Sequence, residues 1–213
     1  MLTSRQISQQ HLIIFTRYPE AGKTKTRLIS TLGDIGAANL QRQMIEYTIS
    51  QAQKLPRSIS IEVRFAGGNL QLMEEWLGAS LSYQFQGEGD LGDRMVRSLS
   101  DAFEQNATQA VIIGTDCPDA DVYILEQAFA KLQNFDLVLG PAVDGGYYLI
   151  GLRRLIPELF INIDWGTTQV LQATLDVANK LNIVYTCLPV LSDIDRPEDL
   201  LVWERILHKE ARD

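Results

Sequence analysis

The chain has 213 residues, of which 46% are hydrophobic, 22% charged and 8% aromatic. This composition is typical of a globular protein and excludes a disordered, collagenous or coiled-coil chain. The 27 acidic residues outnumber the 19 basic residues and give a net charge of −8, which disfavours nucleic acid and anionic membranes as partners because both repel an acidic protein.

Two cysteines, Cys117 and Cys187, are too few for a disulfide framework or a zinc ribbon. The apolar run at residues 12–15 is far shorter than a signal-peptide core or a membrane span. We therefore expect a cytoplasmic protein. No repeat, low-complexity tract or linker interrupts the chain, so residues 1–10 are expected to be a flexible N-terminus and residues 11–213 a single domain.

Short apolar runs alternate with longer segments of helical periodicity. The predicted strands cover residues 12–16, 59–65, 81–85, 110–114, 137–140, 147–151 and 183–188. The predicted helices cover residues 32–53, 70–77, 91–105, 122–132, 167–181 and 197–209. This alternation predicts an α/β fold with a largely parallel sheet that is covered by helices on both faces.

Two strands have informative patterns. Residues 59–65 alternate between apolar and polar side chains, which predicts one solvated face and a place toward the edge of the sheet. Residues 110–114 lack polar alternation and are expected to be buried near the centre. Ligands of open α/β sheets bind beyond the carboxyl ends of the strands, so the loops after the strands are the place to look for chemistry.

The loop after the first strand is basic in an otherwise acidic protein. Arg17, Gly22, Lys23, Lys25 and Arg27 lie within it. Cationic side chains and a glycine that permits close backbone approach can hold the phosphates of a nucleotide. The loop nearly matches a phosphate-binding P-loop, but Arg17 replaces its first glycine, so a P-loop kinase is disfavoured. A solvated basic loop is the alternative.

The segment at 87–92 has the spacing G-x-G-x-x-G but follows the third strand and carries acidic residues, which is wrong for a dinucleotide fingerprint. Gly89, Gly92 and Arg94 are candidates to hold the base or ribose of a nucleotide. An acidic helix N-terminus with no ligand is the alternative.

Carboxylates follow two other predicted elements. Asp116 ends the buried strand, and Asp193 and Asp195 precede the last helix. Hard divalent cations such as Mg²⁺ or Mn²⁺ take oxygen ligands and share them with phosphates. We therefore predict that Asp116 holds a metal ion, with Asp193 or Asp195 as a second ligand.

Neither histidine of the chain lies in a candidate loop, so a general base is expected to be a carboxylate. Asp144 is the best candidate, because Gly145 and Gly146 expose backbone beside it and Tyr147 and Tyr148 offer a wall for a substrate. The alternative is a tight hairpin of the Asp-Gly type.

Five segments together resemble a bacterial family of provisionally assigned glycosyltransferases, formerly a domain of unknown function, in the nucleotide-diphospho-sugar transferase (GT-A) superfamily. They are residues 15–28, 89–95, 113–118, 144–151 and 193–200. The resemblance extends from residue 12 to about residue 201. It implies a GT-A-like three-layer α/β/α sandwich with a mixed, mostly parallel sheet that contains one reversed strand.

The resemblance also implies residue roles. Lys23, Lys25 and Arg27 would contact the nucleotide phosphates, Asp116 would be the metal aspartate, and Asp193 or Asp195 would complete the cation site. Residues 144–148 would face the acceptor or the sugar. The chain departs from the superfamily in having a single Asp116 followed by a cysteine where Asp-x-Asp is usual.

The function implied is metal-dependent glycosyl transfer from a nucleotide sugar to a small-molecule acceptor. The basic loop is also similar to that of nucleotidyltransferases of the superfamily, including the phospholactate guanylyltransferase type. These enzymes couple a nucleoside triphosphate to a phosphorylated small molecule and release pyrophosphate. A non-catalytic nucleotide-binding module is the third alternative.

Overall fold

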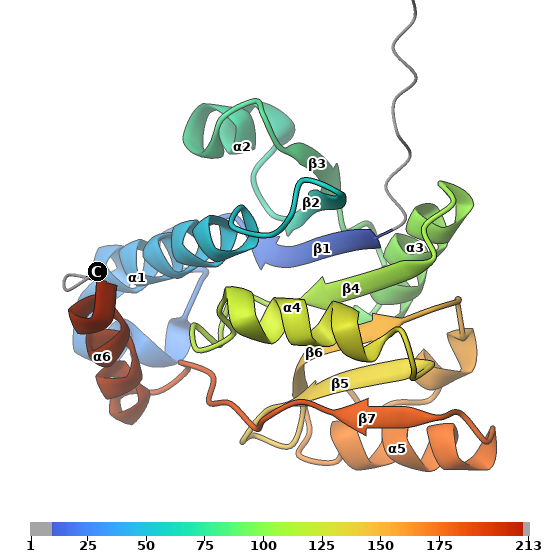
Figure 1. Cartoon of the computed structure of the whole chain (residues 1–213). Coiled ribbons are helices and arrows are strands. Elements are labelled where there is room, and N and C mark those ends of the chain that lie inside the picture. Colours follow the sequence, from blue (N-terminus) through green and yellow to red (C-terminus); the bar gives the residue numbers. More distant parts are fainter. Residues whose placement is uncertain (1–9, 211–213) are drawn as a thin grey trace, which may run out of the picture.

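Seven strands form one sheet in the order β3-β2-β1-β4-β6-β5-β7 (Figure 1). The computed structural model describes residues 10–210, so most of the segment expected to be a flexible N-terminus lies outside the described residues. β6 is antiparallel to β4 and β5, and the other pairs are parallel. The predicted mixed, mostly parallel sheet with one reversed strand is confirmed.

The strands are β1 (Gln10–Arg17), β2 (Ile59–Ala66), β3 (Ser82–Phe85), β4 (Gln109–Ile113), β5 (Leu137–Pro141), β6 (Tyr147–Leu152) and β7 (Tyr185–Cys187). The helices are α1 (Ile29–Ala52), α2 (Leu70–Leu77), α3 (Leu91–Glu104), α4 (Val122–Lys131), α5 (Val170–Lys180) and α6 (Leu200–Glu210). Every predicted element is present within a few residues of its expected bounds. The first helix begins earlier than expected because it includes a kink at Gly33, whose φ is 71°.

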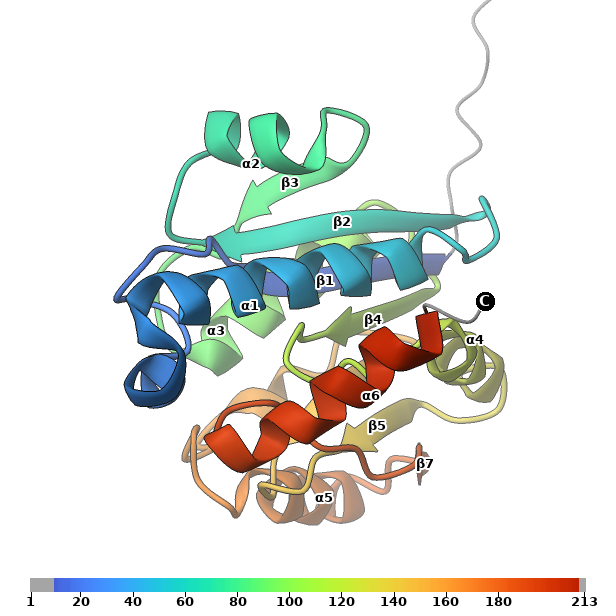
Figure 2. The ribbon, with the colours of Figure 1, turned by 90° about the vertical axis from the view of Figure 1, so that its left-hand side faces the viewer.

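Two apolar layers sandwich the sheet. One is filled mainly from α1 and α4, with residues such as Ile45 and Leu125, and the other from α3 and α5, with residues such as Leu99 and Ala178. α6 packs beside α1 and adds Trp203 to a third cluster (Figure 2). The three-layer α/β/α arrangement is therefore as predicted. No helix in the described part of the chain is both long and apolar enough to cross a membrane.

β2 lies toward one edge of the sheet, as predicted, but the prediction of a solvated face is wrong. β3 pairs on its outer side, and the side chains of Glu62 and Arg64 are buried. Arg64 Nε donates to Glu62, and Arg64 Nη2 donates to Asp101 Oδ2 of α3 at 2.7 Å. His11 Nε2 lies 3.3 Å from Glu62 Oε2. Because the Arg64 guanidinium is paired with two carboxylates, α3 can cover a face that the alternation of polar residues marked as exposed.

β4 has the predicted central place and lies between β1 and β6. Val111 and Ile113 face one apolar layer, and Ala110 and Ile112 face the other. Because β6 runs opposite to β4, the start of β6 lies beside the end of β4, and β1, the other neighbour of β4, ends at the same edge. Side chains from three separate parts of the chain therefore meet at this edge of the sheet.

Candidate functional site

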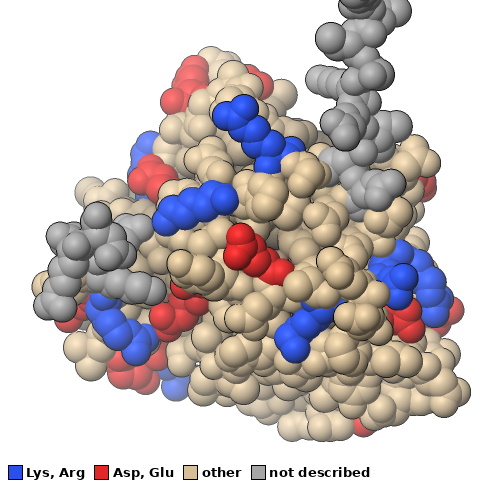
Figure 3. Space-filling view, viewed as in Figure 1, with Lys and Arg blue, Asp and Glu red and all other residues tan. Residues whose placement is uncertain are grey.

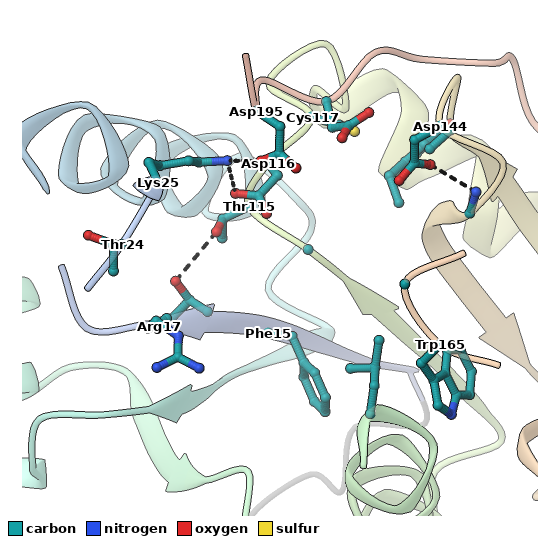
Figure 4. A pocket seen from close by; sticks show the side chains of 18 of the residues that line it. Phe15, Arg17, Thr24, Lys25, Thr115, Asp116, Cys117, Asp144, Trp165 and Asp195 are labelled. Atoms are coloured by element: carbon teal, nitrogen blue, oxygen red, sulfur yellow. Dashed lines mark hydrogen bonds and ion pairs between the residues drawn. The ribbon is translucent and has the colours of Figure 1, made fainter. Parts of the chain in front are cut away.

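A pocket of about 630 Å³ opens where β1 and β4 end and β6 begins (Figure 4). Eleven of the predicted site residues line it: Arg17, Lys23, Lys25, Arg27, Asp116, Asp144, Gly146, Tyr147, Tyr148, Asp193 and Asp195. The loops after β1 and β4, the β5–β6 hairpin and the segment before α6 thus meet as the sequence analysis expects. Gly22, Gly89, Gly92, Arg94 and Gly145 are not among the lining residues.

Lys25 is the best-anchored cation of the pocket. Its Nζ lies 2.8 Å from Asp116 Oδ1, 3.0 Å from Asp195 Oδ1 and 2.6 Å from the carbonyl oxygen of Ile194. Only 3% of the Lys25 side chain is exposed. An ammonium has three protons, and three acceptors surround it. Lys25 therefore reaches a phosphate only by giving up one of these contacts.

The charge state of Lys25 follows from the same geometry. Burial by itself lowers the pKa of a lysine, but attraction to Asp116 and Asp195 and the hydrogen bonds to both carboxylates outweigh it. The pKa of Lys25 is therefore raised from its ordinary value, and the ammonium remains charged at neutral pH.

The other cations of the loop are more open. Lys23 is 67% exposed and pairs with Glu20 at 2.6 Å. Arg27 is 66% exposed and donates to Asp195 Oδ2 at 3.1 Å. Arg17 lines the pocket from the end of β1. These side chains can turn toward an anion with little cost in free energy, because surface ion pairs are weak.

Four aspartates also line the pocket: Asp116, Asp144, Asp193 and Asp195. The backbone nitrogen of Ile194 donates to the carbonyl of Asp116 at 2.9 Å, which ties the segment of Asp193 and Asp195 to the loop after β4. Burial raises the pKa of Asp193, and repulsion by Asp144, Asp195 and Asp116 raises it further. In the described part of the chain, no three Cys, His, Asp or Glu side chains are grouped so that they could hold a metal ion. The predicted metal ligands are thus near one another but do not form a ready-made site.

The predicted hairpin alternative for Asp144 is present. Asp144 Oδ1 accepts a hydrogen bond from the backbone nitrogen of Gly146 at 2.8 Å. The exposed carboxylate of Asp144 lines the pocket (Figure 4). Gly145 has a φ of 90°, and a Cβ there would clash with the carbonyl oxygen of Thr168. Its own carbonyl accepts from Leu171 N at 2.9 Å. Gly145 therefore joins the hairpin to the start of α5 and does not line the pocket.

Both tyrosines that follow the turn have hydroxyls in partly or fully buried surroundings. Burial raises the pKa of Tyr147 and of Tyr148, and Tyr148 donates its hydroxyl to the carbonyl of Pro189 at 3.1 Å. Cys117 also lines the pocket, but burial and then the nearby aspartates raise the pKa of its thiol. These three side chains shape the wall.

The glycine-rich segment before α3 forms the acidic start of that helix, which is the alternative to a nucleotide-binding loop. Asp90 caps the helix, with a reciprocal bond to Asp93. Arg94 Nε donates to the carbonyl of Gly89 at 3.1 Å, and a Cβ on Gly92 would lie 2.9 Å from the ring of Trp165. A role in nucleotide binding for Gly89, Gly92 and Arg94 remains a prediction that the pocket lining does not support.

The apolar end of the pocket was not predicted from the sequence. Phe15, Leu91, Trp165 and Val170 line it, and Phe15 and Trp165 lie away from Lys25 in Figure 4. Trp165 packs edge-on against Tyr147, with ring centroids 6.4 Å apart. A tryptophan beside Gly166, outside any predicted helix or strand, is a signal that could have drawn attention to this end.

Four buried polar side chains that line the pocket were also not predicted from the sequence: Thr16, Gln41, Gln86 and Thr115. Gln86 Nε2 donates to the carbonyls of Thr16 at 2.9 Å and Arg64 at 3.1 Å. The hydroxyl oxygens of Thr16 and Thr115 lie 3.4 Å apart, and Gln41 Nε2 lies 3.4 Å from the latter. These bonds hold the ends of β1, β2 and β4 together.

On the face shown in Figure 3, acidic and basic side chains of the described residues are interspersed.

Comparison with known proteins adds a family and a fold. The family model described as "Uncharacterized protein conserved in bacteria (DUF2064)" matches residues 48–167, more than half of the chain. A solved structure from Desulfovibrio desulfuricans G20, provisionally named a nucleotide-diphospho-sugar transferase, is 32% identical with a TM-score of 0.85. That match covers 89% of this chain and 83% of the other. No protein of curated function matches significantly.

More distant structures share the fold. A CMP:2-keto-3-deoxy-manno-octonic acid synthetase complexed with CTP is 11% identical, with a TM-score of 0.60 over 94% of this chain and 99% of that one. Glucosyl-3-phosphoglycerate synthase from Mycobacterium tuberculosis, in complex with Mn²⁺, UDP and glucosyl-3-phosphoglycerate, is 12% identical, with a TM-score of 0.56 over 91% and 75%. The predicted GT-A-like fold is confirmed.

Proposed function

Since the chain belongs to the DUF2064 family and has the fold of nucleotide-diphospho-sugar transferases, we propose that it transfers a group from a nucleotide-activated donor to a small-molecule acceptor. The pocket carries this proposal. It is lined by exposed cations, by aspartates and, at one end, by aromatic side chains. The pocket therefore offers groups that complement a diphosphate, an acceptor hydroxyl that must lose its proton, and an apolar or sugar ring.

The specific reaction that we propose is glycosyl transfer from a nucleotide sugar. Arg17, Lys23 and Arg27 hold the donor phosphates by charge-assisted hydrogen bonds. An acceptor hydroxyl attacks the anomeric carbon, the bond from that carbon to the phosphate oxygen breaks, and the nucleoside diphosphate leaves. Asp144 takes the proton of the acceptor hydroxyl, since its exposed carboxylate keeps one oxygen outside the bond to Gly146.

A divalent cation, Mg²⁺ or Mn²⁺, belongs to this proposal. Asp116 and Asp195 offer the oxygen ligands that such ions prefer, and the donor phosphates supply further ones. When bound, the ion would neutralise charge on the leaving diphosphate. The carboxylate oxygens of Asp116 and Asp195 are thus of the right chemical type to bind the ion, but in this structure the ammonium of Lys25 lies between them.

Nucleotidyl transfer is the second candidate, and the number of cations favours it. Arg17, Lys23 and Arg27 would suit the higher charge of a nucleoside triphosphate. An oxygen of a phosphorylated acceptor would then attack the α-phosphorus, and pyrophosphate would leave. The two reactions differ in the product that is released.

Product analysis tests the proposal. The protein is first screened by thermal shift against nucleoside triphosphates and nucleotide sugars, each with Mg²⁺, Mn²⁺ or EDTA. A ligand at 100 times its Kd stabilises by about 2.7 kcal/mol. Donors that bind are then incubated with an acceptor panel, with Asp144→Asn as the matched control. Release of a nucleoside diphosphate supports glycosyl transfer, and release of pyrophosphate supports nucleotidyl transfer. Binding without either product indicates a binding module.

A further inference from the structure

We propose that Lys25 is an internal cation that occupies the place of the divalent ion in the free protein, so that the ion binds only together with the donor. The inference rests on the proposed function and deepens it. The three oxygens around the Lys25 ammonium come from Asp116, Asp195 and Ile194, at 2.8, 3.0 and 2.6 Å. All are ligands that a hard divalent cation would also accept.

The position of Lys25 is built into the fold. Its backbone is left-handed, with φ 48° and ψ 43°, although it carries a side chain. This conformation costs a residue other than glycine about 1–2 kcal/mol, and strain of this kind persists where surrounding contacts hold it in place. The Lys25 side chain points toward the two aspartates (Figure 4). Only 3% of it is exposed.

Charge makes the two cations mutually exclusive. An ammonium at hydrogen-bond distance from both carboxylates repels an incoming ion and uses the oxygens that would bind it. Without Lys25, the carboxylates of Asp116 and Asp195 would repel each other and favour a divalent cation. The lack of any group of described residues arranged to hold a metal agrees with this.

The donor can resolve this competition. Its phosphate oxygens can accept the ammonium protons of Lys25 and can also serve as ligands of the ion. The exchange moves Lys25 from the carboxylates to a phosphate as the ion takes its place. Binding of the ion and the donor is then positively coupled, and each raises the affinity of the other equally.

Lys23 provides a matched control. It lies in the same loop, but 67% of it is exposed and it pairs only with Glu20 among the ion pairs of the described residues. Removal of Lys23 therefore leaves the contacts of Asp116 and Asp195 intact. Any effect on metal binding that is specific to Lys25 should be missing from a Lys23 variant.

The test uses Mn²⁺ alone, without nucleotide, and follows free Mn²⁺ by electron paramagnetic resonance. We expect wild type and Lys23→Met to bind Mn²⁺ weakly, and Lys25→Met to bind it about tenfold or more tightly, because a repelling unit charge is gone. Adding Asp116→Asn to Lys25→Met should remove the gain. Equal affinity in wild type and a folded Lys25→Met protein would overturn the proposal.

Folding of the variants is checked by circular dichroism, and Lys25→Gln, which keeps two hydrogen-bond donors, is the second variant. If neither folds, the wild-type titration decides: tight Mn²⁺ binding without nucleotide overturns the proposal, and binding that appears only with UDP or CTP supports it. A negative result here leaves the product assay untouched. Failure of every donor in that assay would instead remove the proposed function.

Discussion

Lys25 and Asp195 are 170 positions apart in the chain, yet Nζ of the one lies 3.0 Å from Oδ1 of the other. This ion pair joins the loop after β1 to the segment before α6 and closes one wall of the pocket. The position of Lys25 is therefore part of the fold as well as of the candidate site, which distinguishes it from its neighbour Lys23.

We expect Lys25→Ala to lower the stability and Lys23→Ala to leave it nearly unchanged. Lys25→Ala leaves two carboxylates together without their cation. Because 51% of the Asp116 side chain and 36% of the Asp195 side chain are exposed, water screens part of their repulsion, and we expect the free energy of unfolding to fall by about 1–2 kcal/mol. Urea unfolding measures both variants. Lys23→Ala should still weaken donor binding. Equal stability of the two variants would show that the Lys25 contacts contribute little.

Asp116→Asn should reduce donor affinity in Mg²⁺ and remove the dependence of that affinity on the ion. The carboxylate is a stronger ligand for a divalent cation than the amide that replaces it. Isothermal titration with and without EDTA gives both quantities. Asp119→Asn is the control, because Asp119 pairs with Arg205 at 3.0 Å and is not among the lining residues. Unchanged affinity and unchanged metal dependence would contradict the metal role of Asp116.

Asp144→Asn should slow turnover by about 10²–10⁴-fold with donor affinity nearly unchanged, as expected for the loss of a general base. Asparagine keeps the side-chain oxygen that accepts from Gly146, so the hairpin should persist. Steady-state kinetics and donor titration separate the two effects. Full turnover would reduce Asp144 to a turn residue, and a joint loss of binding and turnover would place it at the nucleotide or metal.

The acid stability of the protein should depend on Glu62. Burial alone raises the pKa of this carboxyl, but His11, whose Nε2 lies 3.3 Å away, and the charge of Arg64 outweigh it and lower the pKa from 4.5. A lowered pKa stabilises the folded state above the unfolded value, and this contribution is lost as the pH falls from about 4.5 through the folded pKa. Urea unfolding should show a smaller acid loss in Glu62→Gln than in wild type. If wild type and Glu62→Gln lost the same amount of stability as the pH falls, Glu62 would not be the cause of the acid sensitivity.

Gly145→Ala should destabilise the junction between the β5–β6 hairpin and the start of α5. The residue has a φ of 90°, and the added Cβ would meet the carbonyl oxygen of Thr168, which belongs to the backbone and cannot rotate away. We expect the free energy of unfolding to fall by at least about 1–2 kcal/mol from the backbone conformation alone. Gly166→Ala is the matched control, since its φ is 82° but no atom lies within 4 Å of the added Cβ. Equal effects in both variants would mean that the contact with Thr168 has no importance.

Local patterns in the sequence predicted the seven strands and six α-helices of the described residues in their order along the chain, because hydrophobic periodicity depends on neighbouring residues alone. They also predicted that the loops after β1 and β4 would meet at one edge, since parallel strands end on the same side. The burial of Glu62 and Arg64 could not be read in this way. It depends on Asp101, which comes from a helix elsewhere in the chain.

The same holds for the site. The cations and aspartates were recognisable as types of residue with a matching chemistry, and most of them do line one pocket. Whether Lys25 would face a phosphate or pair with Asp116 and Asp195 was decided only by the packing that brings Ile194 and its neighbours beside the loop after β1. Ion pairs are set by distances between side chains, and for residues far apart in the chain these distances exist only once the tertiary structure has formed.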